Sequence, residues 1–401
     1  MKDSYDVVII GAAATGSAIA YFLTANPDFD GSVLLIERDL SFARAATSLS
    51  ASAIRSQFST PINVQISRFS HRFMMDFAET MQVDGQAPQL NFHPGGYLFL
   101  ATNRDQATIL RQNHTVQIAN GADVVLWSAD ELADAFPHLN VADIELASYG
   151  RSGEGWFDNT ALMNGFRNKA RSMGAELIQD EVTAVHRDGN RVTGLRLASG
   201  RRISAGAVVN AAGCGAPVVA RMAGIEIPIE TRKRTVFVFD CARSPEGTAR
   251  INDGRLPLMV EPCGVYCRPE GHFFLASTTP DPDPEVTPDD FDPRYDEFEE
   301  LVWPALAERS REFEAIKIVN QWAGHFDLNI LDHNPIIGPH PEVEGFYFAC
   351  GFSGHGLMQS PAVGRALSEL LIYEEFRTLD LSPLSHDRIS AGAALHERVL
   401  L

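Results

Sequence analysis

The chain has 401 residues, of which 45% are hydrophobic and 21% charged, enough for two domains with a sizeable core. Its formal net charge of −19 argues against a nucleic-acid partner, because phosphate binding needs clustered Lys and Arg. No apolar run reaches the ~18 residues of a membrane span. The apolar stretch at residues 7–10 follows acidic residues, unlike the basic start of a secretory signal. We therefore expect a cytoplasmic protein without a transmembrane segment.

The five cysteines fit a reducing compartment. Cys263 and Cys267 have no CxxC spacing and no adjacent histidine pair, so we expect no metal site. Both are predicted to be ordinary strand residues.

The first 37 residues have the order of a dinucleotide-binding unit. Residues 5–10 are a β-branched run typical of a buried parallel strand. Residues 11–16 predict a glycine-bearing turn, and residues 17–23 predict a helix. A second apolar strand at residues 32–36 finishes at Glu37. This strand–turn–helix–strand–acid order indicates a dinucleotide site.

Each position of this unit has a physical role. Gly11 permits the tight turn, Gly16 lets helix and strand pack closely, and the pyrophosphate lies at the helix N-terminus. Ala13 stands where the pattern has its second glycine, and its methyl group should move the phosphates slightly outward. Glu37 would accept hydrogen bonds from the ribose. The expected contacts are Gly11, Ala13, Ala14, Thr15, Gly16, Glu37 and Arg38.

Four later segments bear on the choice between NAD and FAD. Residues 44–58 are rich in Ser and Ala, and residues 208–213 read V-V-N-A-A-G after a meander of strand-like runs. Residues 322–339 contain W-A-G-H-F-D and D-H-N-P-I-I-G-P. Residues 346–358 end in G-F-S-G-H-G-L-M, and a helix is expected from about Pro361. A turn alone does not need so many glycines, because each costs conformational entropy.

On these segments the sequence resembles the glycine/D-amino-acid oxidase superfamily of FAD-dependent oxidoreductases. It is nearest to sarcosine oxidase, dimethylglycine dehydrogenase, iminodiacetate oxidase-type enzymes and the FAD-dependent oxidoreductase-domain proteins of mitochondria. The resemblance covers nearly the whole chain and implies FAD. It also implies flavin contacts at Thr47, Ser48, Ser50, Ala51, Ser52, Val182, Ala211, Gly213, Gly351, Gly354, His355, Gly356, Leu357 and Met358.

The predicted fold class is α/β, with α+β character overall. The resemblance implies a Rossmann-type, glutathione-reductase-2-like FAD-binding domain interleaved with a substrate domain. We predict the FAD-binding domain at 1–80, 150–220 and 325–401. The substrate domain is predicted at 81–149 and 221–324, where strand-like runs should form an antiparallel sheet over the flavin.

The resemblance implies that the flavin accepts a hydride from the carbon next to the nitrogen of a small amine or amino acid, whose imine then hydrolyses. Substrates of the family usually carry a carboxylate, which a guanidinium binds well. Arg55 is the leading candidate and Arg234 the second, although either could form a surface salt bridge instead. Tyr266 and Arg268 should share one strand face, opposite Cys267, and are further site candidates. Tyr266 would shape the pocket, with an ordinary core tyrosine as the alternative.

His325 and His355 are candidates for proton transfer or for a hydrogen bond to the flavin, with a backbone-anchoring role as the alternative for His355. The sequence also departs from sarcosine oxidase. Met358 replaces a lysine that binds the substrate carboxylate, and Phe274 corresponds to a lysine that activates oxygen. His325 is nearest to its covalent flavin cysteine. We therefore expect noncovalent FAD and leave the electron acceptor open between oxygen and a quinone or electron-transfer protein.

The favoured function is oxidation of an N-substituted glycine, such as sarcosine or iminodiacetate, to glyoxylate or an aldehyde. Oxidation of a D-amino acid or a 2-hydroxy acid is the second hypothesis, because the fold supports all three. A non-catalytic FAD-containing assembly factor is the hypothesis from another class. The oligomeric state is left open.

Overall fold

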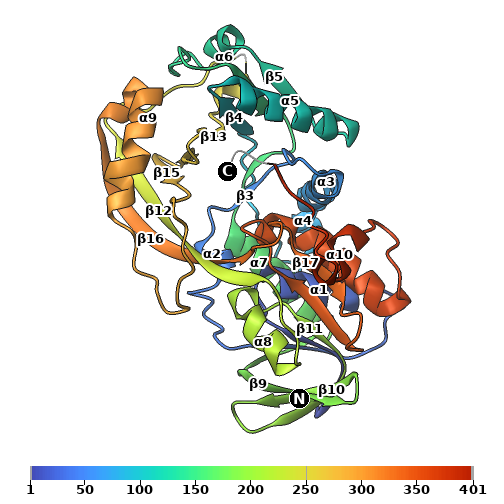
Figure 1. Cartoon of the computed structure of the whole chain (residues 1–401). Helices are drawn as coiled ribbons and strands as arrows, with labels where there is room; N and C mark the ends of the chain where they lie inside the picture. The colour runs from blue at the N-terminus through green and yellow to red at the C-terminus, as the bar shows by residue number, and fades with distance from the viewer. Residues whose placement is uncertain (1, 250, 399–401) are drawn as a thin grey trace.

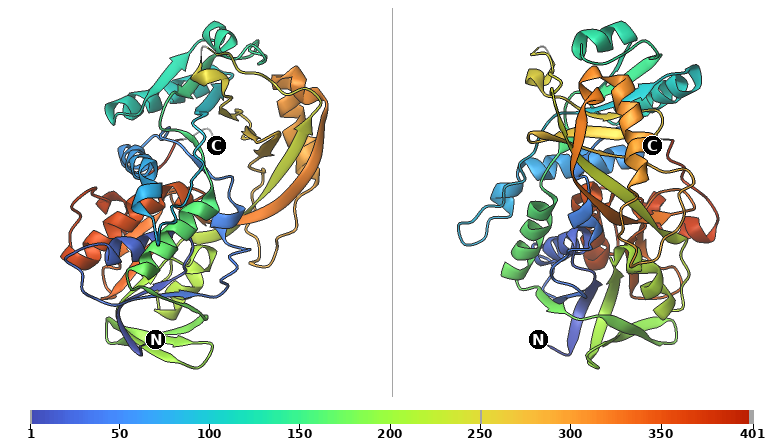
Figure 2. Two further views of the ribbon diagram at one scale, coloured as in Figure 1. Left: turned by 180° about the vertical axis from the view of Figure 1, so that it is seen from behind. Right: turned by 90° about the vertical axis from the view of Figure 1, so that its left-hand side faces the viewer.

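The computed structural model describes residues 2–249 and 251–398, whose strands form two large sheets surrounded by helices (Figure 1). In both views of Figure 2, the sheet that contains the first strand lies at one end of the molecule and the second sheet lies beyond it. We call the second the roof sheet. This mixed architecture confirms the predicted fold class.

The first sheet has the order β17-β18-β11-β1-β2-β8, with β10 and β9 continuing from β11. Strands β18, β11, β1, β2 and β8 are parallel, so their carboxyl ends meet at one edge. Its strands are β1 (Ser4–Ile10), β2 (Val33–Glu37), β8 (Glu176–Gln179), β9 (Val182–Asp188), β10 (Arg191–Leu197), β11 (Arg202–Asn210), β17 (Ile336–Pro339) and β18 (Phe346–Cys350).

Strand β1 is buried on both faces, as its apolar run predicts. Val7 and Ile9 pack into the core formed with four helices, whereas Val8 and Ile10 pack on the other face with α8 (Ala216–Met222). The four helices are α1 (Ala14–Thr24), α3 (Pro61–Met75), α7 (Asn159–Ser172) and α10 (Gly356–Tyr373).

The roof sheet has the order β16-β12-β15-β14-β13-β4-β6-β5. Its strands are β4 (Tyr97–Ala101), β5 (Val124–Trp127), β6 (Leu146–Gly150), β12 (Ile229–Cys241), β13 (Leu258–Val260), β14 (Tyr266–Glu270), β15 (Phe273–Ser277) and β16 (Ile316–Asn329). All pairs are antiparallel except β13 with β4, which are parallel. The sheet is therefore mixed, not wholly antiparallel as predicted.

The two faces of the roof sheet differ. Leu98, Cys267 and Phe274 face an outer core that includes Leu306 of α9 (Trp303–Arg309). Strand alternation turns Tyr97, Phe99 and Tyr266 to the opposite, inner face. The other elements are α2 (Ala46–Leu49), α4 (Phe77–Thr80), α5 (Arg104–Ala119), α6 (Ala129–Ala135), α11 (Asp387–Ser390) and the paired strands β3 (Ala53–Ile54) and β7 (Gly155–Trp156).

Two local predictions were wrong. Helix α10 begins at Gly356, not near Pro361, which lies inside it. Proline has no N–H for the carbonyl one turn earlier, and the Ser360 hydroxyl donates to that carbonyl, on Leu357, at 2.9 Å. Cys263 lies in an exposed turn before β14, whereas Cys267 is a buried strand residue as predicted.

None of the helices in the described part of the chain is long and apolar enough to cross a membrane. The described residues contain no group of three or more His, Cys, Asp or Glu suited to a metal ion. Strand β16 runs through residue 325, where we placed a domain boundary. The division of the chain into two domains stays a prediction.

Candidate flavin and substrate site

The glycine turn after β1 is closely packed. Gly11 has φ +98°, and a Cβ atom on it would lie 2.3 Å from the carbonyl oxygen of Ala211. A Cβ on Gly16 would lie 1.9 Å from the carbonyl oxygen of Gly11. The Ala211 N–H donates to the Ile10 carbonyl at 2.9 Å, so the end of β11 lies against the turn. Both glycines are therefore sterically required.

The start of α1 can receive a pyrophosphate. The N–H of Ala14 donates to Thr47 Oγ1 at 3.3 Å. Among the described residues, the N–H groups of Thr15 and Gly16 have no acceptor, as expected in the first turn of a helix. Ala13 has φ −72°, which alanine adopts without strain, and this explains why the pattern's second glycine is not needed for the turn itself.

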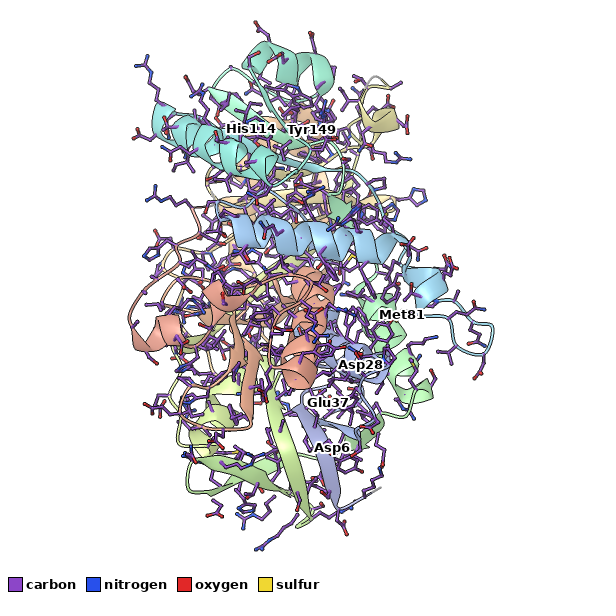
Figure 3. The ribbon with its side chains drawn as sticks, turned by 90° about the vertical axis from the view of Figure 1, so that its right-hand side faces the viewer. Asp6, Asp28, Glu37, Met81, His114 and Tyr149 are labelled. Carbon is purple, nitrogen blue, oxygen red and sulfur yellow. The ribbon has the colours of Figure 1, made fainter. Side chains whose placement is uncertain are left out.

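Glu37 lies at the carboxyl edge of the first sheet. Its Oε2 accepts the Ala12 N–H at 2.9 Å and its Oε1 accepts the Asp39 N–H at 3.1 Å. In Figure 3, Glu37 lies between Asp6, near the amino edge of the sheet, and Tyr149 of the roof sheet. Its carbonyl accepts the Asp180 N–H at 3.0 Å, which brings Val182 to this edge. This edge is where the adenosine of a dinucleotide is expected.

The roof sheet and helix α7 fix the Ser/Ala-rich loop. Trp322 of β16 donates to the Leu49 carbonyl at 3.1 Å, and Asn159 of α7 donates to the Thr47 carbonyl at 2.8 Å. Arg268 is buried and donates to the Ala51 carbonyl from Nε at 3.1 Å and from Nη2 at 2.8 Å. Arg268 therefore anchors the loop between Ser48 and Ser52. Ser52 has φ +61° and donates its N–H to Ser50 Oγ at 3.0 Å.

The G-F-S-G-H-G segment forms a tight bend before α10. Gly351 has φ +74° and Gly354 has φ +89°. Asp327 Oδ2 accepts the Gly351 N–H at 2.5 Å, and burial raises the pKa of Asp327 to about 6. The side chains of Leu357 and Met358 pack in the core. With Gly356 they form the first turn of α10, where N–H groups lack acceptors within the helix and can face an anion.

Arg55 is buried between aromatic rings. Its side chain is 5% exposed, and its guanidinium carbon lies 4.8 Å from the ring centre of Phe58 and 5.8 Å from those of Tyr97 and Phe99. Nη2 donates to His355 Nε2 at 3.0 Å. Nε has no partner in the described part of the chain, and no carboxylate there pairs with the guanidinium. A buried cation without a salt-bridge partner is costly, so this one points to an anionic ligand.

His355 is a neutral partner of Arg55. Burial, and then the charge of Arg55, hold the pKa of His355 well below its usual value. The neutral ring can therefore accept from Arg55, and it packs edge-on to Phe58 with ring centres 5.1 Å apart. His355 orients the arginine and adds no charge.

Glu154 is a site residue that the sequence did not reveal. Burial raises the pKa of Glu154 to about 7, although hydrogen bonds and the Arg55 charge lower it. Its carboxylate accepts the Ser56 N–H at 2.7 Å and Gln57 Nε2–H at 2.9 Å. Its sequence context, S-G-E-G, is typical of a turn and carries no signal of burial. Glu154 lies beside Arg55 and can change the charge that a ligand meets.

Arg234 and Tyr266 share the inner face of the roof sheet, but Arg234 is already paired. Its two terminal nitrogens each lie 2.8 Å from an oxygen of Asp283, and its guanidinium packs on Phe326 at 4.7 Å. Tyr266 lies opposite Ser277 of β15 in the same sheet. Cys267 faces the outer core, as the predicted alternation requires.

His325 points to the other face of the sheet from Arg234. It pairs across the strands with Lys233, whereas Arg234 pairs with Gly324. Its ring lies 2.6 Å from the Asp290 carbonyl and stacks on Phe291 with ring centres 4.0 Å apart. His325 thus holds the acidic loop at residues 279–293, and the structure does not bring it together with Arg55 and His355.

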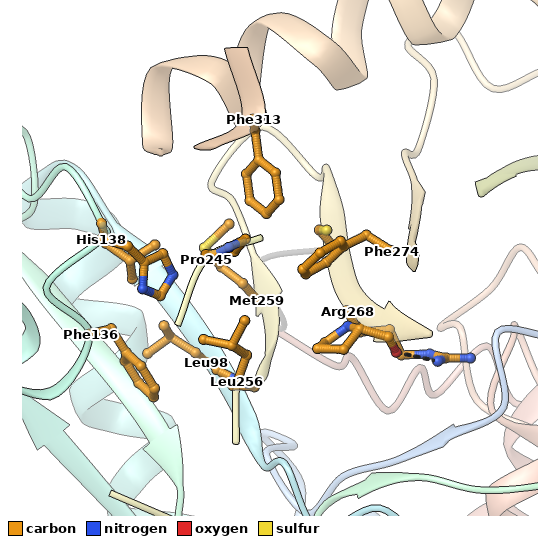
Figure 4. A pocket seen from close by; sticks show the side chains of 13 residues that line it. Leu98, Phe136, His138, Pro245, Leu256, Met259, Arg268, Phe274 and Phe313 are labelled. Atoms are coloured by element: carbon orange, nitrogen blue, oxygen red, sulfur yellow. Dashed lines mark hydrogen bonds between the residues drawn. The ribbon is translucent and has the colours of Figure 1, made fainter. Parts of the chain in front are cut away.

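An apolar pocket lies on the outer face of the roof sheet (Figure 4). Phe136, Met259, Phe274 and Phe313 are among the residues that line it. Arg268 contributes to its edge, with the guanidinium directed away from the other labelled side chains. The pocket is separated by the sheet from Tyr266 and belongs to a different region from Arg55.

Comparisons with known proteins agree with this geometry. A family model described as DAO, FAD dependent oxidoreductase, matches residues 6–370. FAD-dependent oxidoreductase domain-containing protein 1 of Bos taurus is 38% identical over 433 residues, covering 99% of this chain and 87% of that protein. Sarcosine oxidase subunit beta of Arthrobacter sp is 26% identical and covers 99% and 94%. The crystal structure of L-proline dehydrogenase from P. horikoshii has a TM-score of 0.84 at 26% identity, covering 98% and 99%.

The tight glycine turn after β1 and the family match together place the chain among the FAD-dependent oxidoreductases. The chain belongs to the DAO family of FAD-dependent oxidoreductases, and FAD is its cofactor.

Proposed function

We propose that the protein oxidises the C–N bond of a small secondary amino acid with one carboxylate, such as sarcosine. The observation that carries the proposal is Arg55, a buried guanidinium that contacts a neutral histidine and aromatic rings and, among the described residues, forms no salt bridge with a carboxylate. A substrate carboxylate would complete this environment with charge-assisted hydrogen bonds. The related proteins named for sarcosine oxidation support the same substrate class.

The residues of the chain would bind and orient the substrate. The glycine turn, Glu37 and the start of α10 would hold FAD, which would supply the hydride acceptor. Arg55 would fix the carboxylate, and Tyr97, Phe99 and Tyr266 would surround the apolar part of the substrate and exclude water. The amine must be neutral when it is oxidised, and the resulting imine would hydrolyse to glyoxylate or an aldehyde.

Oxygen is not the favoured electron acceptor in this proposal. Phe274, which corresponds to the oxygen-activating lysine, packs in the outer core. The adjacent Leu275 is buried and apolar as well. Neither carries a cation, so a quinone or an electron-transfer protein is the acceptor class we propose.

A panel of amines tests the substrate class. Under anaerobic conditions the oxidised flavin absorbance should disappear with sarcosine and other N-substituted glycines. It should persist with dimethylamine, which is a secondary amine like sarcosine but has no carboxylate. Equal reduction by both compounds, or by none of the amino acids, would contradict the proposal.

The Arg234–Asp283 pair predicts selection against a second carboxylate. Asp283 neutralises the second inner-face arginine, so a dicarboxylate such as iminodiacetate would meet no free cation there. Replacing Asp283 with Asn should raise kcat/KM for iminodiacetate relative to sarcosine by about tenfold, the effect of one partly buried ion pair. Glu285→Gln is the matched control, because it removes the same charge from an exposed position of the same loop. If the ratio of the two kcat/KM values is unchanged in Asp283→Asn, Arg234 does not bind the second carboxylate.

Glu154 predicts a pH effect on carboxylate binding. Burial raises the pKa of Glu154 to about 7, so the group is neutral below that pH and negative above it. The negative form partly cancels the charge of Arg55, and the substrate should therefore bind more weakly as pH rises through about 7. The expected loss is about fivefold, on the order of 1 kcal/mol. The effect can be measured with acetate, a carboxylate that cannot be oxidised as an amine, whose dissociation constant should rise as pH passes about 7. In Glu154→Gln this rise should disappear. A rise of the same size in both proteins would assign it to another group.

A further inference from the structure

The segment at residues 395–398 returns to the start of α3, more than three hundred residues earlier in the chain (Figure 1). We propose that Glu397 is a positioning residue. It fixes two segments relative to each other: the residues that lead from Arg55 into α3, and the first turn of α10. The inference rests on the proposed function, because it concerns the residues that would bind the substrate carboxylate.

The Glu397 carboxylate binds the start of α3 with five hydrogen bonds. Oε2 accepts the N–H of Ser59 at 2.8 Å and its hydroxyl at 2.6 Å. Oε1 accepts the N–H of Thr60 at 3.2 Å, the hydroxyl of Thr60, and Asn63 Nδ2–H at 2.7 Å. Thr60 is the N-cap of α3 and its side chain makes no capping bond, so the Glu397 carboxylate supplies a favourable negative charge at this end of the helix.

Ser59 directly follows a residue of the candidate site. The Phe58 ring is fully buried, lies 4.8 Å below the Arg55 guanidinium and packs edge-on against His355 at 5.1 Å. Holding Ser59 therefore holds the Phe58 ring, which contacts both Arg55 and His355. A shift of this ring would move the guanidinium and its hydrogen-bond partner together.

A second route leads from Glu397 to α10. Asn63 Nδ2, which donates to Glu397, also lies 2.6 Å from Asn334 Oδ1. The Oδ1 of Asn63 accepts Gln359 Nε2–H at 3.0 Å. Gln359 lies four residues after His355 in α10, and its side chain is buried. One carboxylate thus reaches both segments that carry the Arg55–His355 pair.

The returning segment is itself anchored. Leu395 donates its N–H to Asp332 at 3.0 Å and accepts Asn334 Nδ2–H at 2.5 Å. Asp332 is buried in an ion pair with Arg388 at 2.7 Å. The backbone of Arg398 donates to Ser59 Oγ at 2.7 Å and accepts Asn113 Nδ2–H at 2.7 Å. These bonds fix the backbone on both sides of Glu397, so its carboxylate can hold the start of α3 in place.

The test uses the FAD-loaded full chain and acetate, a carboxylate that cannot be oxidised as an amine. Acetate binding is measured from the change in the flavin spectrum, and amide hydrogen exchange is measured over residues 55–63 and 355–359. Glu397→Ala should weaken acetate binding about tenfold, as expected from a small displacement of a positioned group. It should also speed exchange in both segments. Glu397→Gln, which keeps the shape but not the charge, should lie between Glu397→Ala and the unmodified protein.

His396→Ala is the matched control, because His396 is the exposed neighbour of Glu397. It should leave acetate binding and exchange unchanged. If Glu397→Ala speeds exchange only at the start of α3 and binds acetate normally, Glu397 is a helix cap and the inference is wrong. If the unmodified protein does not bind acetate, or Arg55→Met binds it equally well, the proposed function fails instead. In that case amide exchange at residues 355–359 alone tests the inference. Faster exchange there in Glu397→Ala supports positioning of α10 by Glu397, and unchanged exchange contradicts it.

Discussion

Replacing Gly16 with alanine is expected to give a colourless protein. The added Cβ would lie 1.9 Å from the Gly11 carbonyl oxygen, a distance that forces α1 away from the turn after β1. Overpacking of this kind costs about 1–3 kcal/mol, which a large domain tolerates. The displacement falls where the N–H groups of Thr15 and Gly16 must meet the pyrophosphate, so FAD affinity should fall by roughly 100-fold. The loss of FAD affinity is measured as the FAD content of the protein after purification and again after reconstitution with FAD.

Gly215→Ala is the control for the first prediction. A Cβ at this position would lie 3.6 Å from the Ala212 Cβ, an ordinary contact, and the backbone there has φ −81°. This variant should stay yellow. Normal FAD content in Gly16→Ala, with an unchanged circular dichroism spectrum, would show that the nucleotide does not lie on the turn before α1.

Replacing Arg55 with methionine is expected to lower kcat/KM for an N-substituted glycine by roughly 200-fold, about 3 kcal/mol. Charge-assisted hydrogen bonds contribute ~1.5–3 kcal/mol each, and a bidentate pair would lose two of them. Methionine fills much of the space between Phe58, Tyr97 and Phe99, so the loss reports the charge and not a cavity. Stopped-flow flavin reduction measures it.

Arg55→Lys separates charge from geometry. Lysine keeps the cation but not the planar pair of donors, so part of the loss should be recovered. FAD content should be normal in both variants. Similar kinetics in Arg55→Met and the unmodified protein would mean that another group binds the carboxylate, and the proposed function would lose its main support.

Local sequence signals predicted the first sheet better than the roof. The strand, glycine turn and helix at residues 5–23 depend on neighbours in sequence, and β1 and α1 lie close to the expected positions. The parallel pairing of β13 with β4 joins segments about 160 residues apart, and no local pattern records it. The early start of α10 was missed because Pro361 normally marks a helix boundary, whereas here a serine hydroxyl takes the place of the missing N–H.

Arg55 was named from the resemblance of its loop to the family and because a guanidinium suits a carboxylate, and its role stays a prediction. The pairing of Arg234 could not be predicted, because its partner Asp283 is 49 residues away in a loop with several acidic residues. Glu154 and Glu397 look like ordinary turn and tail residues. The roles proposed for them rest on hydrogen bonds to Gln57 and Ser59, residues that only the folded chain brings near them.

Product analysis of a single anaerobic turnover tests the central claim most directly. The FAD-loaded protein is mixed with an N-substituted glycine without any electron acceptor, and the aldehyde or glyoxylate formed is compared with the flavin reduced. The account predicts one carbonyl product for each reduced flavin, and both should form roughly 200-fold more slowly in Arg55→Met at low substrate concentration. A flavin that stays oxidised with every amino acid, or becomes reduced without a carbonyl product, would contradict it.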